Sequence, residues 1–90
     1  MYHISGINRG NITLYALSTC VWCKKTKQLL NDLGVEYNCE DVDLLDKGDY
    51  ERVKMEIARW NPSISFPTIV INNEKCILGF DRDKIIKELG

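Results

Sequence analysis

The chain has 90 residues, 44% of them hydrophobic and 28% charged, and its formal net charge is −1. This length suits one domain with a modest core, and the balanced charge excludes recruitment of nucleic acid by a global electrostatic field. Residues 1–10 lack the apolar segment of a signal peptide, and no apolar run approaches the roughly 20 residues of a membrane span. We therefore expect a cytoplasmic protein with no membrane partner, in a reducing compartment where a close cysteine pair is more often catalytic or metal-binding than a structural disulfide.

Residues 1–11 carry little pattern and contain Gly6 and Gly10. We interpret them as an N-terminal extension of uncertain order, either a frayed tail or a short extra strand, ahead of a domain over residues 12–90. Residues 11–17 are rich in β-branched and apolar side chains, which predicts a buried strand.

Cys20 and Cys23 follow this strand at once, with two residues between them. Apolar residues then recur at helical spacing, at positions Trp22, Leu29, Leu30 and Leu33. Gly34 is typical of the residue just past a helix end, so a helix is predicted from the cysteine pair to Leu33. The pair therefore lies where a strand turns into a helix.

The rest of the chain predicts five further elements. Residues 35–40 alternate as in a second strand, which should lie parallel to the first because a helix separates them. After a charged loop, a second helix shows an apolar stripe and ends at Asn61-Pro62; the stripe comprises Tyr50, Val53, Ile57 and Trp60. Residues 68–71 and 75–78 flank Asn72-Asn73 as in a β-hairpin, and Asp81 can cap a last short helix. The predicted order is β-α-β-α-β-β-α.

Cys20 and Cys23 meet the requirements of dithiol chemistry if the helix begins between them. Backbone N–H groups at a helix start favour the thiolate of Cys20, and Cys23 lies one turn further in, where it can attack a mixed disulfide formed at Cys20. We therefore expect Cys20 to be the nucleophile and Cys23 the resolving thiol. Structural zinc sites use two close cysteine pairs, so Cys39 and Cys76, which are far apart, are interpreted as core residues and no metal is expected.

Two tryptophans have structural interpretations as well. Trp22 either packs on the domain as part of the helix stripe or forms an exposed apolar rim beside the cysteines. Trp60 is predicted to lie in the core at the end of the second helix.

Together with the element order, three motifs resemble those of the glutaredoxins, which are disulfide oxidoreductases of the thioredoxin fold. Cys20-Val21-Trp22-Cys23 occupies the place of the family's Cys-Pro-Tyr-Cys. Ser65-Phe66-Pro67 occupies the place of Thr-Val-Pro, and residues 78–82 that of Gly-Gly-Cys-Asp-Asp. The resemblance implies an α/β thioredoxin fold, a four-stranded mixed sheet flanked by three helices. It also implies that Pro67 is a cis-proline, that the backbone at Phe66 pairs with a bound thiol peptide, and that this groove is lined by Trp22, Gly79, Phe80 and Asp81.

Three positions depart from the family pattern. The lysine usual before the first cysteine is absent from residues 15–19, and Leu78 and Arg82 replace a glycine and an aspartate that normally hold the charged ends of glutathione. The segment from Gly79 is similar instead to glutaredoxin-like proteins that serve ribonucleotide reductase and are recharged by a reductase enzyme.

The resulting expectation is a monomeric dithiol–disulfide oxidoreductase that reduces protein disulfides or mixed disulfides and binds no organic cofactor. Its electrons come either from glutathione or from a thioredoxin-reductase-like enzyme. The alternative from a different functional class is an iron–sulfur or metal carrier that uses the same cysteines.

Overall fold

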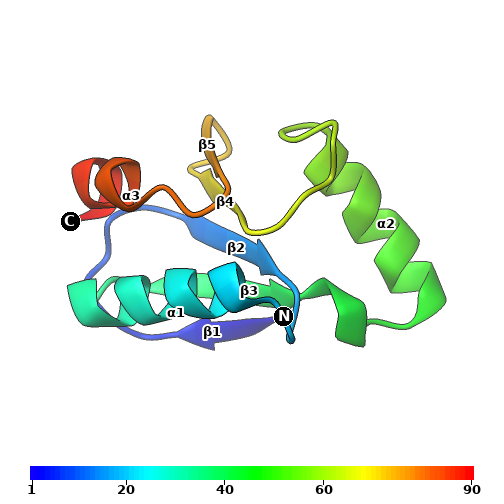
Figure 1. The fold of residues 1–90 in the computed structure, drawn as a ribbon, viewed down its shortest axis with the longest axis horizontal. Helices are drawn as coiled ribbons and strands as arrows, with labels where there is room; N and C mark the ends of the chain where they lie inside the picture. Colours follow the sequence, from blue (N-terminus) through cyan, green and yellow to red (C-terminus); the bar gives the residue numbers. More distant parts are fainter.

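The computed structural model describes residues 1–90 and contains a five-stranded sheet and three α-helices (Figure 1). The strands are β1 (Tyr2–Ile4), β2 (Ile12–Ala16), β3 (Tyr37–Asp41), β4 (Thr68–Ile71) and β5 (Lys75–Leu78). The helices are α1 (Val21–Leu33), α2 (Lys47–Ala58) and α3 (Arg82–Leu89), and the 3-10 helix η1 (Val42–Leu44) lies between β3 and α2. From β2 onward this is the predicted order, with η1 added.

The sheet has the strand order β1-β3-β2-β4-β5, one strand more than the four predicted, and of the two interpretations of residues 1–11 the short extra strand is the one observed. The fifth strand is β1, which pairs antiparallel with β3, Tyr2 opposite Cys39 and Ile4 opposite Tyr37. A strand of three residues is too short to show a period of two, and its partner comes far later in the chain. The pairing therefore leaves no local signal in the sequence.

The central strand β2 joins the two halves of the sheet. It pairs parallel with β3, as the intervening helix predicted, and antiparallel with β4. Because β4 runs opposite to β2, the end of β2 and the start of β4 lie at the same edge, with Tyr15 opposite Thr68. The end of β5 reaches this edge as well, because Leu78 pairs with Thr68.

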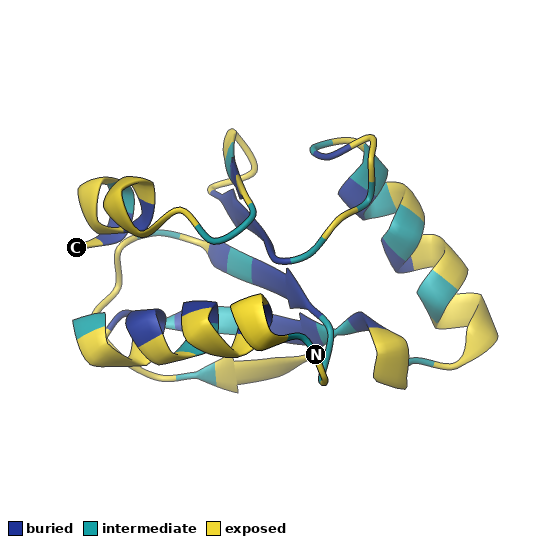
Figure 2. Cartoon of the chain, viewed as in Figure 1, coloured by how far each residue is buried: buried dark blue, intermediate teal, exposed yellow.

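Helices cover both faces of the sheet and form two hydrophobic clusters (Figures 1 and 2). The larger cluster has 14 buried residues and joins one sheet face to α1 and α3, with Leu30 and Ile85 fully enclosed. The smaller has five and joins the opposite face to α2 through Val53 and Ile57. In Figure 2 the central strands are largely dark blue, whereas the outer surfaces of the helices are yellow. Burial of these apolar surfaces supplies the main favourable term in folding.

Helix α1 ends as predicted, but its buried face begins one residue later than the predicted stripe. Gly34 follows the helix with φ +70°, a left-handed conformation that glycine adopts without steric cost. The buried residues of the helix are Cys23, Thr26, Leu29 and Leu30, whereas the Trp22 residue is 54% exposed. Of the two interpretations of Trp22, the exposed rim is the one the structure supports.

The ends of the other helices follow from their caps. Helix α2 begins within the predicted charged loop, because the Asp46 carboxylate accepts the Asp49 N–H at 2.8 Å. It ends at Ala58, and Trp60 beyond it is half-buried against the smaller cluster rather than fully in the core. Asp81 caps α3 as predicted, accepting the Lys84 N–H at 3.1 Å.

The β4–β5 hairpin has the predicted bounds, and both turn residues, Asn72 and Asn73, have positive φ. Cys39 is fully buried in the larger cluster, whereas Cys76 is half-buried, with its thiol donating to the Trp60 carbonyl at 3.7 Å. None of the helices combines the length and the apolar composition that crossing a membrane requires.

Candidate active site

Cys20 is the N-cap residue of α1, at the point where β2 gives way to the helix. Its Sγ accepts the N–H of Cys23 at 3.2 Å, and its own N–H donates to the Leu17 carbonyl at 3.2 Å. Desolvation opposes ionisation of Cys20, but hydrogen bonds from the Cys23 thiol and from the backbone at Cys23 and Trp22 outweigh it and lower the pKa of Cys20. The positive end of the helix dipole favours the thiolate in the same direction.

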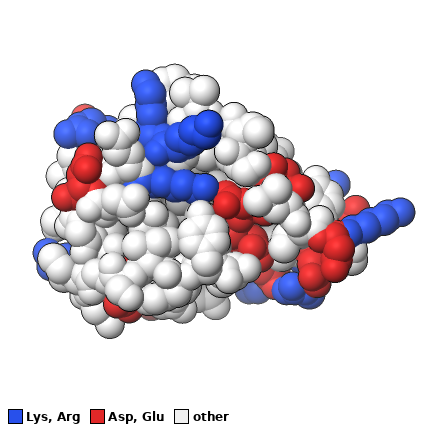
Figure 3. Space-filling model, turned by 90° about the horizontal axis from the view of Figure 1, so that it is seen from below, with Lys and Arg blue, Asp and Glu red and all other residues white.

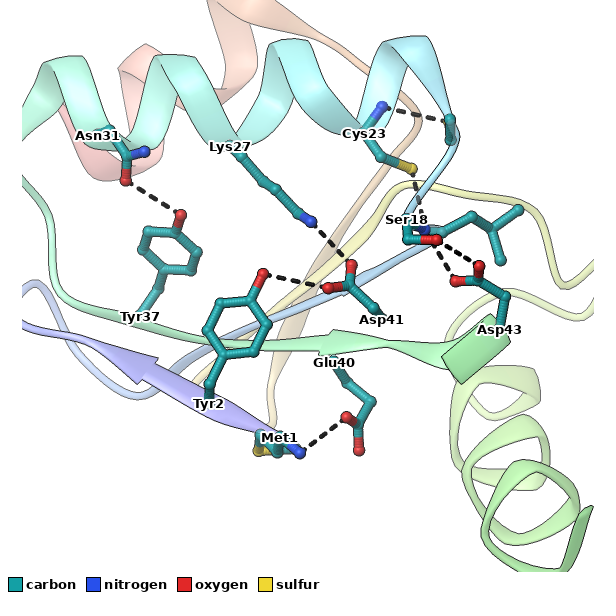
Figure 4. Close-up of polar contacts among 12 residues, drawn as sticks. Met1, Tyr2, Ser18, Cys23, Lys27, Asn31, Tyr37, Glu40, Asp41 and Asp43 are labelled. Carbon is teal, nitrogen blue, oxygen red and sulfur yellow. Dashed lines mark hydrogen bonds and ion pairs between the residues drawn. The ribbon is translucent and has the colours of Figure 1, made fainter. Parts of the chain in front are cut away.

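Cys23 lies one turn into α1 and is completely buried (Figure 4). Burial, followed by its hydrogen bond to Cys20, raises the pKa of Cys23 to about 12. One backbone group favours its thiolate, the Leu17 N–H, which donates to Cys23 Sγ at 3.5 Å. The two thiols therefore differ in both ionisation and access: Cys20 is partly exposed with a lowered pKa, and Cys23 is buried with a raised one.

An exposed apolar ridge borders the cysteines. The ring of Trp22 stacks on Phe80 with centroids 5.8 Å apart and planes 25° from parallel. Lys25 Nζ lies 4.6 Å from the centroid of the same indole ring, within cation–π range. Val21 and Leu78 extend the ridge, with 62% and 49% of their surface exposed. Large exposed apolar side chains gathered beside a reactive thiol are typical of a docking surface.

The loop before β4 meets the end of β5 at the same edge of the sheet. The Phe66–Pro67 peptide is cis, as the resemblance implied, and the Pro67 carbonyl accepts the Gly79 N–H at 2.8 Å. Gly79 has φ +75° with open space around it, so its backbone conformation, rather than crowding, calls for glycine. Phe66 and Phe80 pack against the larger cluster, as Cys20 does. The fold therefore brings the three motifs to one end of the molecule.

Asn61 shapes this loop, although the sequence pattern indicated only that it ends a helix. Its side chain is buried, and its Nδ2 lies 2.9 Å from Ser65 Oγ, 3.1 Å from Thr68 Oγ1 and 3.2 Å from the Ser65 carbonyl. Thr68 Oγ1 in turn donates to the Ser65 carbonyl at 2.8 Å. This network fixes the segment that leads into Pro67. Asn61 and Thr68 are seven residues apart, and no local sequence pattern connects them.

The predicted groove residue Asp81 is exposed, and its carboxylate is engaged in capping α3. Phe80 and Arg82 line an open groove of about 330 Å³ against α1, together with Lys25. The largest groove, about 410 Å³, lies elsewhere, around His3 and Asn11, and holds none of the predicted site residues. Because it is distant from the cysteines, we do not assign the reaction to it.

A second group of polar side chains lies between α1, β3 and β1 (Figure 4). Lys27, one turn after Cys23, donates to Asp41 Oδ1 at 2.7 Å, and the Tyr2 hydroxyl donates to Asp41 Oδ2 at 3.3 Å. Desolvation lowers the pKa of Lys27, but the hydrogen bonds to Asp41 and Tyr2 outweigh it and raise that pKa overall.

The charged side chains are not spread evenly over the surface. On the face drawn in Figure 3, basic side chains gather in one area and acidic side chains lie beside them. No group of three or more His, Cys, Asp or Glu side chains is arranged to hold a metal ion.

Comparison with known proteins identifies the family. Residues 12–77 match the family model described as Glutaredoxin. The chain belongs to the glutaredoxin family. Members of this family are thiol–disulfide oxidoreductases, and this chain is an enzyme of that class. Its architecture is accordingly the thioredoxin fold of the glutaredoxins, with β1 as an additional edge strand.

This glutaredoxin is similar along nearly its whole length to solved relatives. The glutaredoxin of Methanosarcina mazei Go1 is 52% identical, with a TM-score of 0.93 over 99% of this chain and 86% of its own. The methanoredoxin of Methanosarcina acetivorans is also 52% identical, with a TM-score of 0.92 over 94% and 90%. Among curated proteins, the Gene 56 protein of Mycobacterium phage D29 is 31% identical over 82% of this chain and 77% of its own.

Proposed function

We propose that this glutaredoxin reduces protein disulfides or mixed disulfides through Cys20 as nucleophile and Cys23 as resolving thiol. The observation that carries the proposal is the difference between the two thiols in burial and in pKa. Cys20 caps α1 with a lowered pKa, while Cys23 is fully buried with a pKa of about 12 and donates its N–H to Cys20 Sγ. The thiolate is the attacking form, so the first attack belongs to Cys20.

The reaction then runs in two exchanges. The Cys20 thiolate attacks one sulfur of the substrate disulfide, forms a mixed disulfide with it and releases the other sulfur as a thiolate. Cys23 loses its proton to solvent and attacks Cys20 Sγ, which closes the Cys20–Cys23 disulfide and frees the second substrate thiol. Two electrons pass from the protein dithiol to the substrate, and a reductant must return them.

The exposed ridge of Val21, Trp22 and Leu78 supports a protein as the substrate. These exposed side chains lie at the end of the sheet that carries Cys20 and offer an apolar contact area to a partner. We propose that Phe66, Pro67, Gly79, Phe80 and Asp81 complete the contact region, because β4, β5 and α3 bring them to the same edge.

The reductant is either glutathione or a thioredoxin-reductase-like enzyme. The solved structure of buckwheat glutaredoxin is a complex with glutathione, and shared family membership makes glutathione a candidate here. Two substitutions argue against glutathione as the reductant. The exposed Leu78 replaces a glycine of the family pattern, and the cation Arg82 replaces an aspartate. The equilibrium potential of the Cys20–Cys23 couple separates the two reductants. A value of about −200 to −230 mV means that glutathione can recharge the pair, and about −270 mV means that a dedicated reductase is needed.

Two variants test the assignment of the cysteines. Cys20→Ser should abolish disulfide reduction, because it removes the attacking thiolate. Cys23→Ser should leave the first attack intact and trap the mixed disulfide, which mass spectrometry detects as an adduct on Cys20. Full reductase activity in Cys20→Ser would show that the assignment is wrong.

A further inference from the structure

The turn between β2 and α1 is connected to η1 by hydrogen bonds from Ser18 to the Asp43 carboxylate (Figure 4). Asp43 Oδ1 accepts the Ser18 N–H at 2.8 Å, and Asp43 Oδ2 accepts the Ser18 hydroxyl at 2.5 Å. These hydrogen bonds, the hydroxyl first, hold the pKa of Asp43 below its usual value, so the carboxylate is ionised at neutral pH. Hydrogen bonds to a charged acceptor are roughly twice as strong as neutral ones.

The Ser18 atoms that Asp43 binds are next to Leu17, whose two backbone groups contact the two cysteines. The Ser18 N–H and the Leu17 carbonyl form one planar peptide group, so fixing the N–H also fixes the carbonyl. That carbonyl accepts the Cys20 N–H at 3.2 Å. On its other side, Leu17 donates its own N–H to Cys23 Sγ at 3.5 Å. The Leu17 N–H lies in the preceding peptide group, so Asp43 acts on it through the Leu17 backbone, which is held between β2 on one side and the anchored Ser18 on the other.

We propose that Asp43 is a positioning residue for the resolving step. By anchoring Ser18, it restricts rotation of the Leu17 backbone at the end of β2 and so keeps the Leu17 N–H directed at Cys23 Sγ. This inference rests on the proposed roles of Cys20 and Cys23. In that step Cys23 gives its proton to solvent, and its thiolate attacks Cys20 Sγ. The Cys20–Cys23 bond forms as the bond from Cys20 to the substrate breaks, and the substrate leaves as a thiolate that takes up a proton.

The thiolate of Cys23 should depend on Asp43 more than the thiolate of Cys20 does. Cys23 is buried, and the Leu17 N–H is the backbone group that favours its thiolate. The Cys20 thiolate is supported by the Cys23 thiol and by backbone groups within α1, which Asp43 does not touch. Loss of Asp43 should therefore slow resolution much more than the first attack.

The test measures both steps separately with a fluorescent protein mixed disulfide in a stopped-flow instrument. For Asp43→Ala we expect the rate of resolution to fall by about tenfold, because the charge-assisted hydrogen bonds to Ser18 are lost. The rate of the first attack should change by less than about twofold. Asp43→Asn keeps an acceptor oxygen for the Ser18 N–H and should recover most of the rate. Ser18→Ala keeps the N–H bond, loses the hydroxyl bond and should fall between.

Asp49 supplies the matched control. It is another exposed aspartate, on α2, where it pairs with Arg52 and touches no part of the cysteine turn. Asp49→Ala removes the same charge and should leave both steps unchanged. Amide hydrogen exchange provides a second measurement, because the Leu17 N–H should exchange faster in Asp43→Ala while amides in β4 keep their wild-type rates.

Three outcomes would overturn the proposal: unchanged resolution in Asp43→Ala, an equal fall in both rate constants, or the same slowing in Asp49→Ala. If Asp43→Ala does not fold, unchanged resolution in Ser18→Ala refutes the proposal instead. Activity retained in Cys20→Ser refutes the proposed function itself, so the two failures are distinct.

Discussion

In the reduced protein, Cys20 and Cys23 differ in ionisation and in exposure, and we predict that iodoacetamide distinguishes them. The pKa of Cys20 lies below the ordinary thiol value of 9.0. At least about 1 in 100 of these thiols is therefore ionised at pH 7, whereas a pKa of about 12 leaves Cys23 about 1 in 100,000 ionised. Since only the thiolate reacts, the ratio of alkylation rates should exceed about a thousand from ionisation alone. The complete burial of Cys23 increases it further.

The assay follows alkylation of the fully reduced protein at pH 5 to 9. Both cysteines precede Lys24 in one tryptic peptide, so fragmentation of that peptide by tandem mass spectrometry assigns the label to one sulfur or the other. The alkylation rate at Cys20 should reach half of its high-pH value at a pH below 9. In urea, where the fold is lost, the two cysteines should react alike. If the two alkylation rates in the folded protein at pH 7 lie within tenfold of each other, the assignment of different roles to the two thiols is refuted.

Three further predictions concern the fold around the site. Stability should fall as pH rises from about 9 towards 12, because burial raises the pKa of Cys23, Tyr15 and Tyr37, so these groups ionise first in the unfolded chain. A urea midpoint that rises over this range would contradict the sign. Asn61→Ala should cost about 1–3 kcal/mol of unfolding free energy, since it leaves buried partners unsatisfied; Asn11→Ala, at an exposed position without positive φ, serves as the comparison, and equal costs would argue against the network. Ile85→Ala should cost about 2–5 kcal/mol in chemical denaturation, and the neighbouring Ile86→Ala much less, because Ile85 is enclosed while Ile86 is 38% exposed. A larger loss at Ile86 would mean that α3 packs on its other face.

Local patterns account for most of the fold. The hairpin of β4 and β5 could be predicted to the residue because Asn72 and Asn73 lie directly between two apolar runs. Gly34 and Asp81 likewise mark helix ends through their own conformation or side chain. In each case the determining interaction spans only a few residues, so the sequence around it contains the necessary information.

Contacts between distant residues could not be predicted in this way. Ser18 and Asp43 are 25 positions apart, and each alone resembles an ordinary polar loop residue. Strand β1 is similarly invisible, because its pairing is decided by the free edge of β3. For the site, the cysteine pair was accessible from sequence, whereas the contacts around it, such as the Asn61 network and the Asp43–Ser18 hydrogen bonds, depend on the assembled fold.

The position of β1 has a consequence for the order in which the chain assembles during synthesis. Tyr2–Ile4 are made well before Tyr37–Asp41, yet β3 is their only partner in the sheet. β3 in turn lies beside β2 only after the crossover through α1 has formed. During synthesis, β1 therefore stays without a partner in the sheet at least until β3 has been made. Of β1, β2 and β3, the strand that comes first in sequence order cannot join the sheet before the one that comes third.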